Sequence, residues 1–230
     1  WMRTAQVATE LRRASIVVGL DQYLDQVRHL LRPGTTVCGS GLGDEEARAR
    51  DAVELAGKGN AVALIGSGDA GVYAMASPAM ELAGPGIEVV GVPGVTAALA
   101  ASALLGAPLG HDHVLISLSD LHTPWWVISR RVRAAAEGDF VVCFYNPRST
   151  ARDWQLGTAL DVLREHRTPS TPVGAVRQAS RPGQRVWCAP LGEFDPSDVD
   201  MFTTVIVGCS QTTMVAGRMV TPRGYQWMPE

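Results

Sequence analysis

Short apolar runs alternate along the chain with longer segments in which apolar residues recur every three to four positions. The short runs predict buried strands, and the longer segments predict amphipathic helices. The predicted strands are SIVVG at 15–19, TTVCGS at 35–40, AVALIG at 61–66, IEVVGVPG at 87–94, DFVVCFYNP at 139–147 and PVGAVRQ at 172–178. The predicted helices cover 4–14, 23–31, 43–59, most of 71–83, 95–106, 127–138 and 150–166.

Strands that alternate with helices are typical of a largely parallel sheet covered by helices. Two more strands, RVWCAPLGEF at 185–194 and DMFTTVIVGCS at 200–210, have the alternating or β-branched pattern of antiparallel additions. A polar segment with proline and glycine follows residue 106, and we place a domain junction near 108–116. The predicted fold is therefore α/β, with two consecutive α/β domains at 1–112 and 113–230 and a ligand cleft between them.

Composition narrows the class of protein. The chain has 230 residues, 46% of them hydrophobic, and a formal net charge of −3. This charge argues against a nucleic-acid partner, and no apolar run approaches the roughly 20 residues that span a bilayer. The first residue is Trp1, so we expect a chain trimmed from a longer one.

The cysteines and histidines offer no metal site. Cys38, Cys143, Cys188 and Cys209 form no C-x-x-C pair, which suggests reduced thiols in the cytoplasm. The H-x-H spacing at 111–113 supplies only two ligands, so no bound metal is predicted.

The run AVALIGSGDAGVYAMA at 61–76 reads as a strand, a glycine loop and a helix, which is a common way to hold a cofactor. It contains no Lys or Arg, and Asp69 would repel phosphate, so a phosphate-binding loop is excluded. A cofactor with a positive centre and ribose hydroxyls fits better. Asp69 can accept from the ribose or an ammonium group, brace the loop, or cap the following helix.

A second run, VPGVTAALAASALLGAPLG at 92–110, turns at Pro93-Gly94 and continues as a helix of alanines with Thr96 at its start. Small side chains there leave room for a flat ligand. Tight packing of the helix on the sheet explains the same composition equally well.

These runs, in order, resemble the tetrapyrrole methylases. The matching stretches are GSGDAGVYAMA (66–76), PGVTAALAASALLGAPLGHD (93–112), ISLSDLHTPW (116–125), FYNPRS (144–149), DWQL (153–156), VDMFTTVIVGCSQT (199–212) and TPRGY (221–225). Within the family, SLSDLHTPW and FYNPRS are most similar to the enzymes that methylate C17 of precorrin-3B or cobalt-factor III.

The resemblance implies S-adenosylmethionine as cofactor, S-adenosylhomocysteine as product, a precorrin substrate, a cytoplasmic homodimer, and no nucleic-acid or membrane partner. It also implies methylation with ring contraction in cobalamin biosynthesis. The cofactor residues that it implies are Ser67, Gly68, Asp69, Val72, Thr96, Ala97, Asn146 and Ala179.

Ring contraction needs proton transfers. The candidates lie on the SLSDLHT segment: Ser117, Ser119, Asp120 and His122. Asp120 can instead cap the next helix, and His122 can be an ordinary surface residue. Arg148 and Arg152 are predicted to bind substrate carboxylates.

The chain departs from the family pattern at Ala70 and Ala74, and the family's N-terminal glycine-rich loop is missing from it. Two alternatives therefore stay open: a corrin methylase acting at another carbon, and a non-catalytic module that binds a tetrapyrrole or the cofactor.

Overall fold

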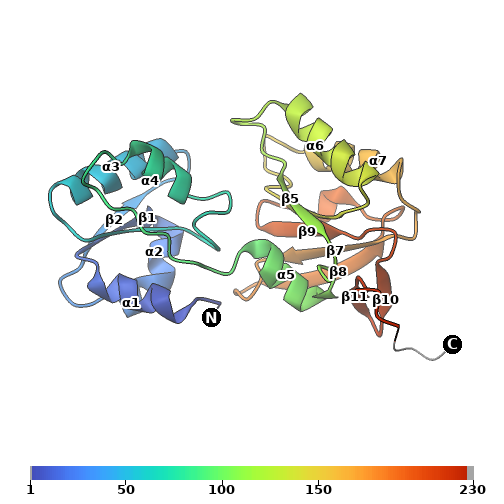
Figure 1. Cartoon of the computed structure of the whole chain (residues 1–230), viewed down its shortest axis with the longest axis horizontal. Helices are drawn as coiled ribbons and strands as arrows, with labels where there is room; N and C mark the ends of the chain where they lie inside the picture. The colour runs from blue at the N-terminus through green and yellow to red at the C-terminus, as the bar shows by residue number, and fades with distance from the viewer. Residues whose placement is uncertain (1, 227–230) are drawn as a thin grey trace. The chain divides into compact units, whose positions relative to one another are not determined.

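The computed structural model describes residues 2–226. Internal contacts divide the chain into two compact units, of which unit 1 ends at Thr96 and unit 2 begins at Ala97. Each unit is an α/β structure with its own sheet (Figure 1).

Unit 1 is built on a parallel three-stranded sheet in the order β2-β1-β3, as the alternating pattern predicts. Its elements are α1 (Ala5–Arg13), β1 (Ile16–Leu20), α2 (Asp21–Val27), the 3-10 turn η1 (Arg28–Leu30), β2 (Thr36–Ser40), α3 (Glu45–Gly57), β3 (Val62–Ile65) and α4 (Ala76–Leu82).

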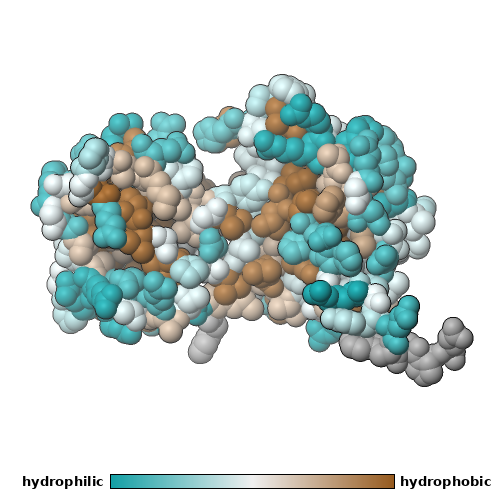
Figure 2. All heavy atoms as spheres, in the orientation of Figure 1, coloured by the Kyte–Doolittle hydropathy of each residue, from teal (hydrophilic) through white to brown (hydrophobic). Residues whose placement is uncertain are grey.

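The central strand β1 is buried along its whole length because both faces of the sheet are covered. Val17 packs with Leu11 of α1 and Leu24 of α2 on one face. Ile16 and Val18 join α3 on the other. In the view of Figure 2, hydrophobic residues of unit 1 form a band at the level of the sheet, with hydrophilic residues above and below it.

Unit 2 contains a mixed five-stranded sheet in the order β5-β6-β9-β7-β8 and a small sheet in the order β10-β11-β4. Its elements are α5 (Ala97–Leu105), β4 (Gly106–Ala107), β5 (His113–Ser117), α6 (Trp125–Glu137), β6 (Val141–Tyr145), α7 (Gln155–Arg164), β7 (Pro172–Arg177), β8 (Arg185–Pro190), the 3-10 turn η2 (Pro196–Asp198), β9 (Thr203–Val207), β10 (Thr213–Val215) and β11 (Arg218–Val220).

The five-stranded sheet lies between two helical layers. Val142 and Phe144 of β6 face a core shared with α6 and α7, which lie side by side over that face (Figure 1). Val141 and Cys143 face a second core with α5. The antiparallel character predicted for β8 and β9 is confirmed, since β7 pairs antiparallel with both.

One predicted element of unit 1 is wrong, and another is present but begins later than its predicted range. Residues 87–94 form no strand, although the run IEVV is β-branched, because no strand of the described residues pairs with them. Strand propensity depends on such a partner and on a face to bury. Residues 71–75 are turn and bend, so α4 begins only at Ala76.

The contact-based division of the chain differs from the predicted one. Ala98, Ala101 and Leu105 of α5 are buried in a core with strands of the five-stranded sheet, so α5 belongs to unit 2 and the division falls after Thr96 rather than residue 112. The segment 108–116, predicted as a junction, contains most of the edge strand β5.

Candidate functional site

Asp69 is the central residue of the first glycine loop. Its Oδ1 accepts a hydrogen bond from the Gly71 N–H at 2.8 Å, and its Oδ2 accepts one from the Gly94 N–H at 2.9 Å. The second bond joins two loops that are 25 residues apart in the chain. Asp69 therefore braces the loop, one of its predicted roles, and it does not cap α4, whose N-cap position is Met75.

The two loops of unit 1 touch through their backbones. A Cβ added at Gly94 would overlap the Gly68 carbonyl oxygen, so only glycine allows this approach. Gly68 itself has a φ of 76°, a conformation that glycine adopts without strain. Ser67 and Val72 are half-buried in the first loop, and Thr96 is buried at the end of the second.

In unit 2, one backbone N–H group at the N-terminus of α5 donates a hydrogen bond to a side chain from β6. The Ala98 N–H donates to the Tyr145 hydroxyl oxygen at 2.8 Å. Ala97, predicted to contact the cofactor, is half-buried at the first position of α5.

The loops after β6 and β7 adopt unusual backbone conformations. Asn146 has a φ of 49°, and Ala179 lies between Gln178 and Ser180, with φ of 48° and 59°. Tyr73, in the first loop, has a φ of 51°. These are four of the six non-glycine residues with positive φ that the described part of the chain contains. Such strain gathers at functional sites, so it favours these three loops as binding loops.

A polar cluster forms where the parallel strands β5 and β6 end. The Ser117 hydroxyl accepts from the Asn146 side-chain amide at 3.0 Å and from the Ser119 N–H at 3.3 Å. Ligands of α/β proteins bind at the carboxyl ends of such strands. The structure thus brings together two residues of the SLSD motif and one of the YNP motif.

Asp120 extends this cluster toward α7. Its Oδ2 accepts from the Gln155 side-chain amide at 3.0 Å, and its Oδ1 lies 3.9 Å from the Arg152 Nε. Arg152 Nη1 also donates to the carbonyl oxygens of Leu118 and Asn146. Asp120 does not lie at the N-cap of α6, which is Pro124, so the capping alternative is wrong.

The remaining predicted residues lie around this cluster. Arg148 donates to the Pro196 carbonyl at 3.2 Å and is half-buried. His122 is exposed in the bend that precedes α6.

Sequence reasoning overlooked Gln155 and Tyr145 as site residues. A signal for Gln155 was present, because it is a polar residue on the apolar stripe of α7 formed by Leu156, Ala159 and Leu160. Tyr145 carried no such signal, since a tyrosine at a strand end is ordinary.

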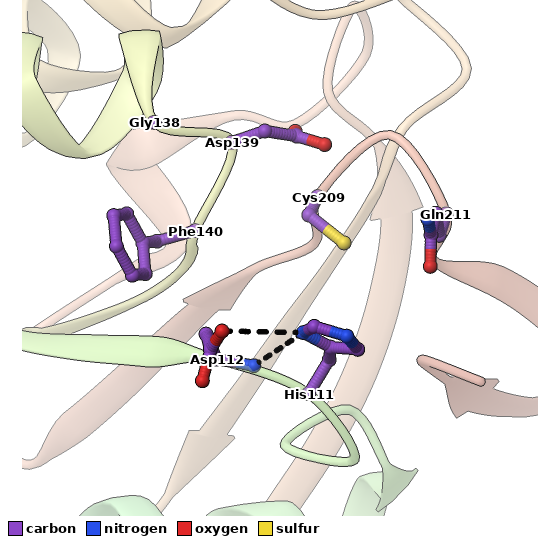
Figure 3. A pocket seen from close by; sticks show the side chains of 7 residues that line it. All are labelled: His111, Asp112, Gly138, Asp139, Phe140, Cys209 and Gln211. Carbon is purple, nitrogen blue, oxygen red and sulfur yellow. Dashed lines mark hydrogen bonds and ion pairs between the residues drawn. The ribbon is translucent and has the colours of Figure 1, made fainter. Parts of the chain in front are cut away.

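A cavity of about 190 Å³ opens at the other end of these strands, where β5 and β6 begin and β9 ends. The Cys209 thiol points into it (Figure 3). Its lining residues are His111, Asp112, Gly138, Asp139, Phe140, Cys209 and Gln211. None of the predicted cofactor or catalytic residues lines it. The candidate residues of unit 1 lie in its glycine loops, and those of unit 2 lie in and around its polar cluster.

The described residues contain no group of three or more His, Cys, Asp or Glu side chains placed to hold a metal ion. Burial raises the pKa of the Cys143 thiol to about 12, which keeps it protonated and unreactive near neutral pH. Within residues 2–226, no helix combines the length and apolar character needed to cross a membrane.

Comparison with known proteins identifies the family. The model described as Tetrapyrrole (Corrin/Porphyrin) Methylases matches residues 4–195. The chain belongs to the tetrapyrrole methylase family. The resemblance expected from the glycine loops and the SLSD and YNP motifs is confirmed.

Individual family members are similar over nearly the whole chain. A protein of Salmonella typhimurium named probable cobalt-factor III C(17)-methyltransferase is 46% identical over 97% of this chain and 94% of its own. A Sinorhizobium protein named precorrin-3B C(17)-methyltransferase is 42% identical over 96% and 91%.

Solved structures of tetrapyrrole methylases share the fold. The crystal structure of the methyltransferase CobJ matches with a TM-score of 0.91 at 38% identity, over 96% of this chain and 94% of that one. A uroporphyrin-III C-methyltransferase from Thermus thermophilus, solved with S-adenosylhomocysteine, matches with a TM-score of 0.66 at 23% identity, over 89% and 90%. At that identity the second likeness speaks for the fold alone.

Proposed function

We propose that the protein transfers a methyl group from S-adenosylmethionine to C17 of precorrin-3B or cobalt-factor III, with ring contraction, in cobalamin biosynthesis. The observation that carries this proposal is the 46% identity, over 97% of the chain, to a relative named for C17 methylation of cobalt-factor III. The second relative, named for precorrin-3B, supports the same carbon and leaves the metal content of the substrate to experiment.

The residues of the glycine loops fit S-adenosylmethionine. When bound, this cofactor supplies a methyl group from a positively charged sulfonium. The loop at 66–76 has no basic side chain that would repel this charge. Asp69 spends one lone pair of each oxygen on a backbone N–H, so acceptor capacity remains for a ribose hydroxyl or the ammonium group.

We assign the cofactor to the residues that the sequence predicts for it: Ser67, Gly68, Asp69, Val72, Thr96, Ala97, Asn146 and Ala179. The positive φ at Asn146 and on both sides of Ala179 supports backbone contacts there, because it turns peptide groups away from their usual directions.

The polar cluster of unit 2 is the proposed place for substrate chemistry. Ser117, Ser119, Asp120 and His122 are the candidates for proton transfer during ring contraction, and Arg148 and Arg152 are the candidates to bind substrate carboxylates. The protein contributes to methyl transfer mainly by alignment of the donor with the acceptor carbon.

A turnover assay with methyl-labelled S-adenosylmethionine tests the function. Precorrin-3B and cobalt-factor III are supplied in parallel, and products are separated by mass and absorption. Label at C17 with a contracted ring supports the proposal, and the faster substrate defines the pathway. Label at another carbon favours a different corrin methylase. Cofactor binding without label on either substrate favours a non-catalytic binding module.

We also propose a homodimer in the cytoplasm. Four free cysteines, one of them exposed, are compatible with a reducing compartment. Light scattering of the purified chain measures its mass, and a value near twice 24.5 kDa supports the dimer.

A further inference from the structure

Gln155 is a buried polar residue on a helix face that is otherwise apolar. Its exposed fraction is 1%, and its neighbours on α7, Leu156, Ala159 and Leu160, belong to the main hydrophobic core of unit 2. Burial of an amide costs free energy unless its atoms are hydrogen-bonded. A leucine at this position would suit the core better, so the amide needs another explanation.

Only half of the Gln155 amide is satisfied among the described residues. Nε2 donates to Asp120 Oδ2 at 3.0 Å, whereas Oε1 is buried with no hydrogen-bond partner. A carboxylate can only accept, so the amide must turn its NH₂ group toward Asp120, which leaves its buried oxygen without a donor. The orientation that serves Asp120 is therefore the one that is unfavourable for Gln155.

Arg152 holds the other side of Asp120. Its side chain is 13% exposed, and its Nε lies 3.9 Å from Asp120 Oδ1. Its Nη1 bonds to the carbonyl oxygens of Leu118 and Asn146, at 3.3 and 2.9 Å, which fixes the planar guanidinium between the loops after β5 and β6. Asp120 keeps 28% of its side chain exposed, so a ligand can reach the carboxylate while both oxygens are oriented.

We propose that Gln155 is a positioning residue for Asp120, with Arg152 as the second group that fixes the same carboxylate. The inference rests on the proposed function, in which the Asp120 carboxylate acts as a base and accepts a proton from the tetrapyrrole during ring contraction. A displacement of about 1 Å in a reacting group can lower a rate about a hundredfold. The unpaired Oε1 is the stability cost of this arrangement.

The variant Gln155→Leu separates positioning from folding. It keeps the approximate size of the side chain and removes the unpaired buried oxygen, so the thermal unfolding midpoint is expected to stay the same or rise. The affinity for S-adenosylmethionine, measured by calorimetry, is expected to stay the same. Ring contraction is expected to slow by about ten- to a hundredfold while label is still transferred, which leaves methylated, uncontracted product.

The variant Gln155→Glu tests the electrostatic side of the same contact and does not depend on how Leu is tolerated. Two carboxyl groups about 3 Å apart share a proton, which raises the pKa of the pair. The rising limb of the pH–rate profile for ring contraction should therefore move to higher pH. A residue with only a structural role would leave this limb in place.

Gln211→Leu is the matched control, because Gln211 is exposed at the opposite edge of the sheet. Wild-type rates and an unshifted pH profile in both Gln155 variants would overturn the inference. So would a Leu variant that unfolds at lower temperature and loses methylation and contraction equally. If the wild-type chain itself transfers no label to either substrate, the proposed function fails first, and that outcome is distinct from either of these.

Discussion

At the scale of single residues, the backbones of Gly68 and Gly94 lie so close together that no side chain fits at Gly94. We expect Gly94→Ala to push the two loops apart, because its Cβ would overlap the Gly68 carbonyl oxygen and lie 3.2 Å from the Asp69 Cα. The Asp69–Gly94 hydrogen bond would then stretch or break. The free energy of unfolding should fall by about 1–3 kcal/mol, measured by urea denaturation.

Gly91→Ala is the control for this change, since an added Cβ at Gly91 meets no atom within 4 Å. Affinity for S-adenosylmethionine should fall in the Gly94 variant and stay at the wild-type value in the Gly91 variant. Equal stability and affinity in the two variants would contradict the role of this close approach.

The kind of ligand that a loop can bind could be predicted from the sequence more fully than the contacts that its residues make. The lack of basic side chains around Asp69 excluded a phosphate loop without any structure. The sequence could not predict that both Asp69 oxygens accept hydrogen bonds from backbone N–H groups. Gly94 is 25 residues away, and its approach depends on the folded loops. Gln155 was within the motif DWQL, yet its partner Asp120 lies 35 residues earlier.

At the scale of elements, the start of α5 depends on a tyrosine from β6. Tyr145→Phe removes the hydroxyl that accepts from the Ala98 N–H and leaves that buried donor unpaired. The free energy of unfolding is expected to fall by about 1–3 kcal/mol.

Hydrogen exchange locates the effect of the Tyr145 variant. The Ala98 amide should lose protection, while the amide of Val132, buried in α6, keeps it relative to the global stability. Unchanged exchange at Ala98 would show that water or another group replaces the hydroxyl.

Asp200, in the turn before β9, forms a pH-dependent ion pair with Arg177 of β7. Partial burial raises the pKa of Asp200, but hydrogen bonds from Thr203, Arg177 and the Phe202 N–H outweigh it, so the net pKa lies below its ordinary value of 3.8. A carboxyl with a lowered folded-state pKa stabilises the protein above its unfolded-state pKa and loses this effect as the pH falls through the folded-state pKa.

We therefore expect Asp200→Asn to be less stable than the wild type above about pH 5, with the difference fading below about pH 4. The difference should be less than about 1 kcal/mol, because solvent screens this half-exposed pair. Urea denaturation across pH 3–7 measures it. A difference that grows toward low pH would show the opposite sign of linkage.

Element prediction succeeded where local pattern and tertiary pairing agree. The predicted runs that contain β1, β6 and β7 each became strands buried between two helical layers. The run at 87–94 has the same β-branched composition but finds no strand partner among the described residues. The hairpin of β10 and β11 escaped prediction because its strands have only three residues each.

At the scale of the whole molecule, the two-unit α/β organisation was predictable from alternating strands and helices, but the boundary was not. The helix α5 is a run of small residues that suits many packing partners. Only the folded structure shows that Leu105 packs against Gly174, where a larger residue than glycine would overlap it.

The proposed cofactor residues lead to a hydrogen-exchange prediction for the entire chain. Hydrogen exchange is measured with and without S-adenosylhomocysteine. Protection should rise in peptides from 66–72, 93–98, 145–148 and 177–180, because these contain the proposed cofactor residues. Peptides from 138–140 and 209–213, at the opposite edge of the unit 2 sheet, should not change and serve as the internal control. Unchanged protection in any of these four peptides would contradict the assignment of its residues to the cofactor, because a bound ligand slows the local opening of a segment that it contacts.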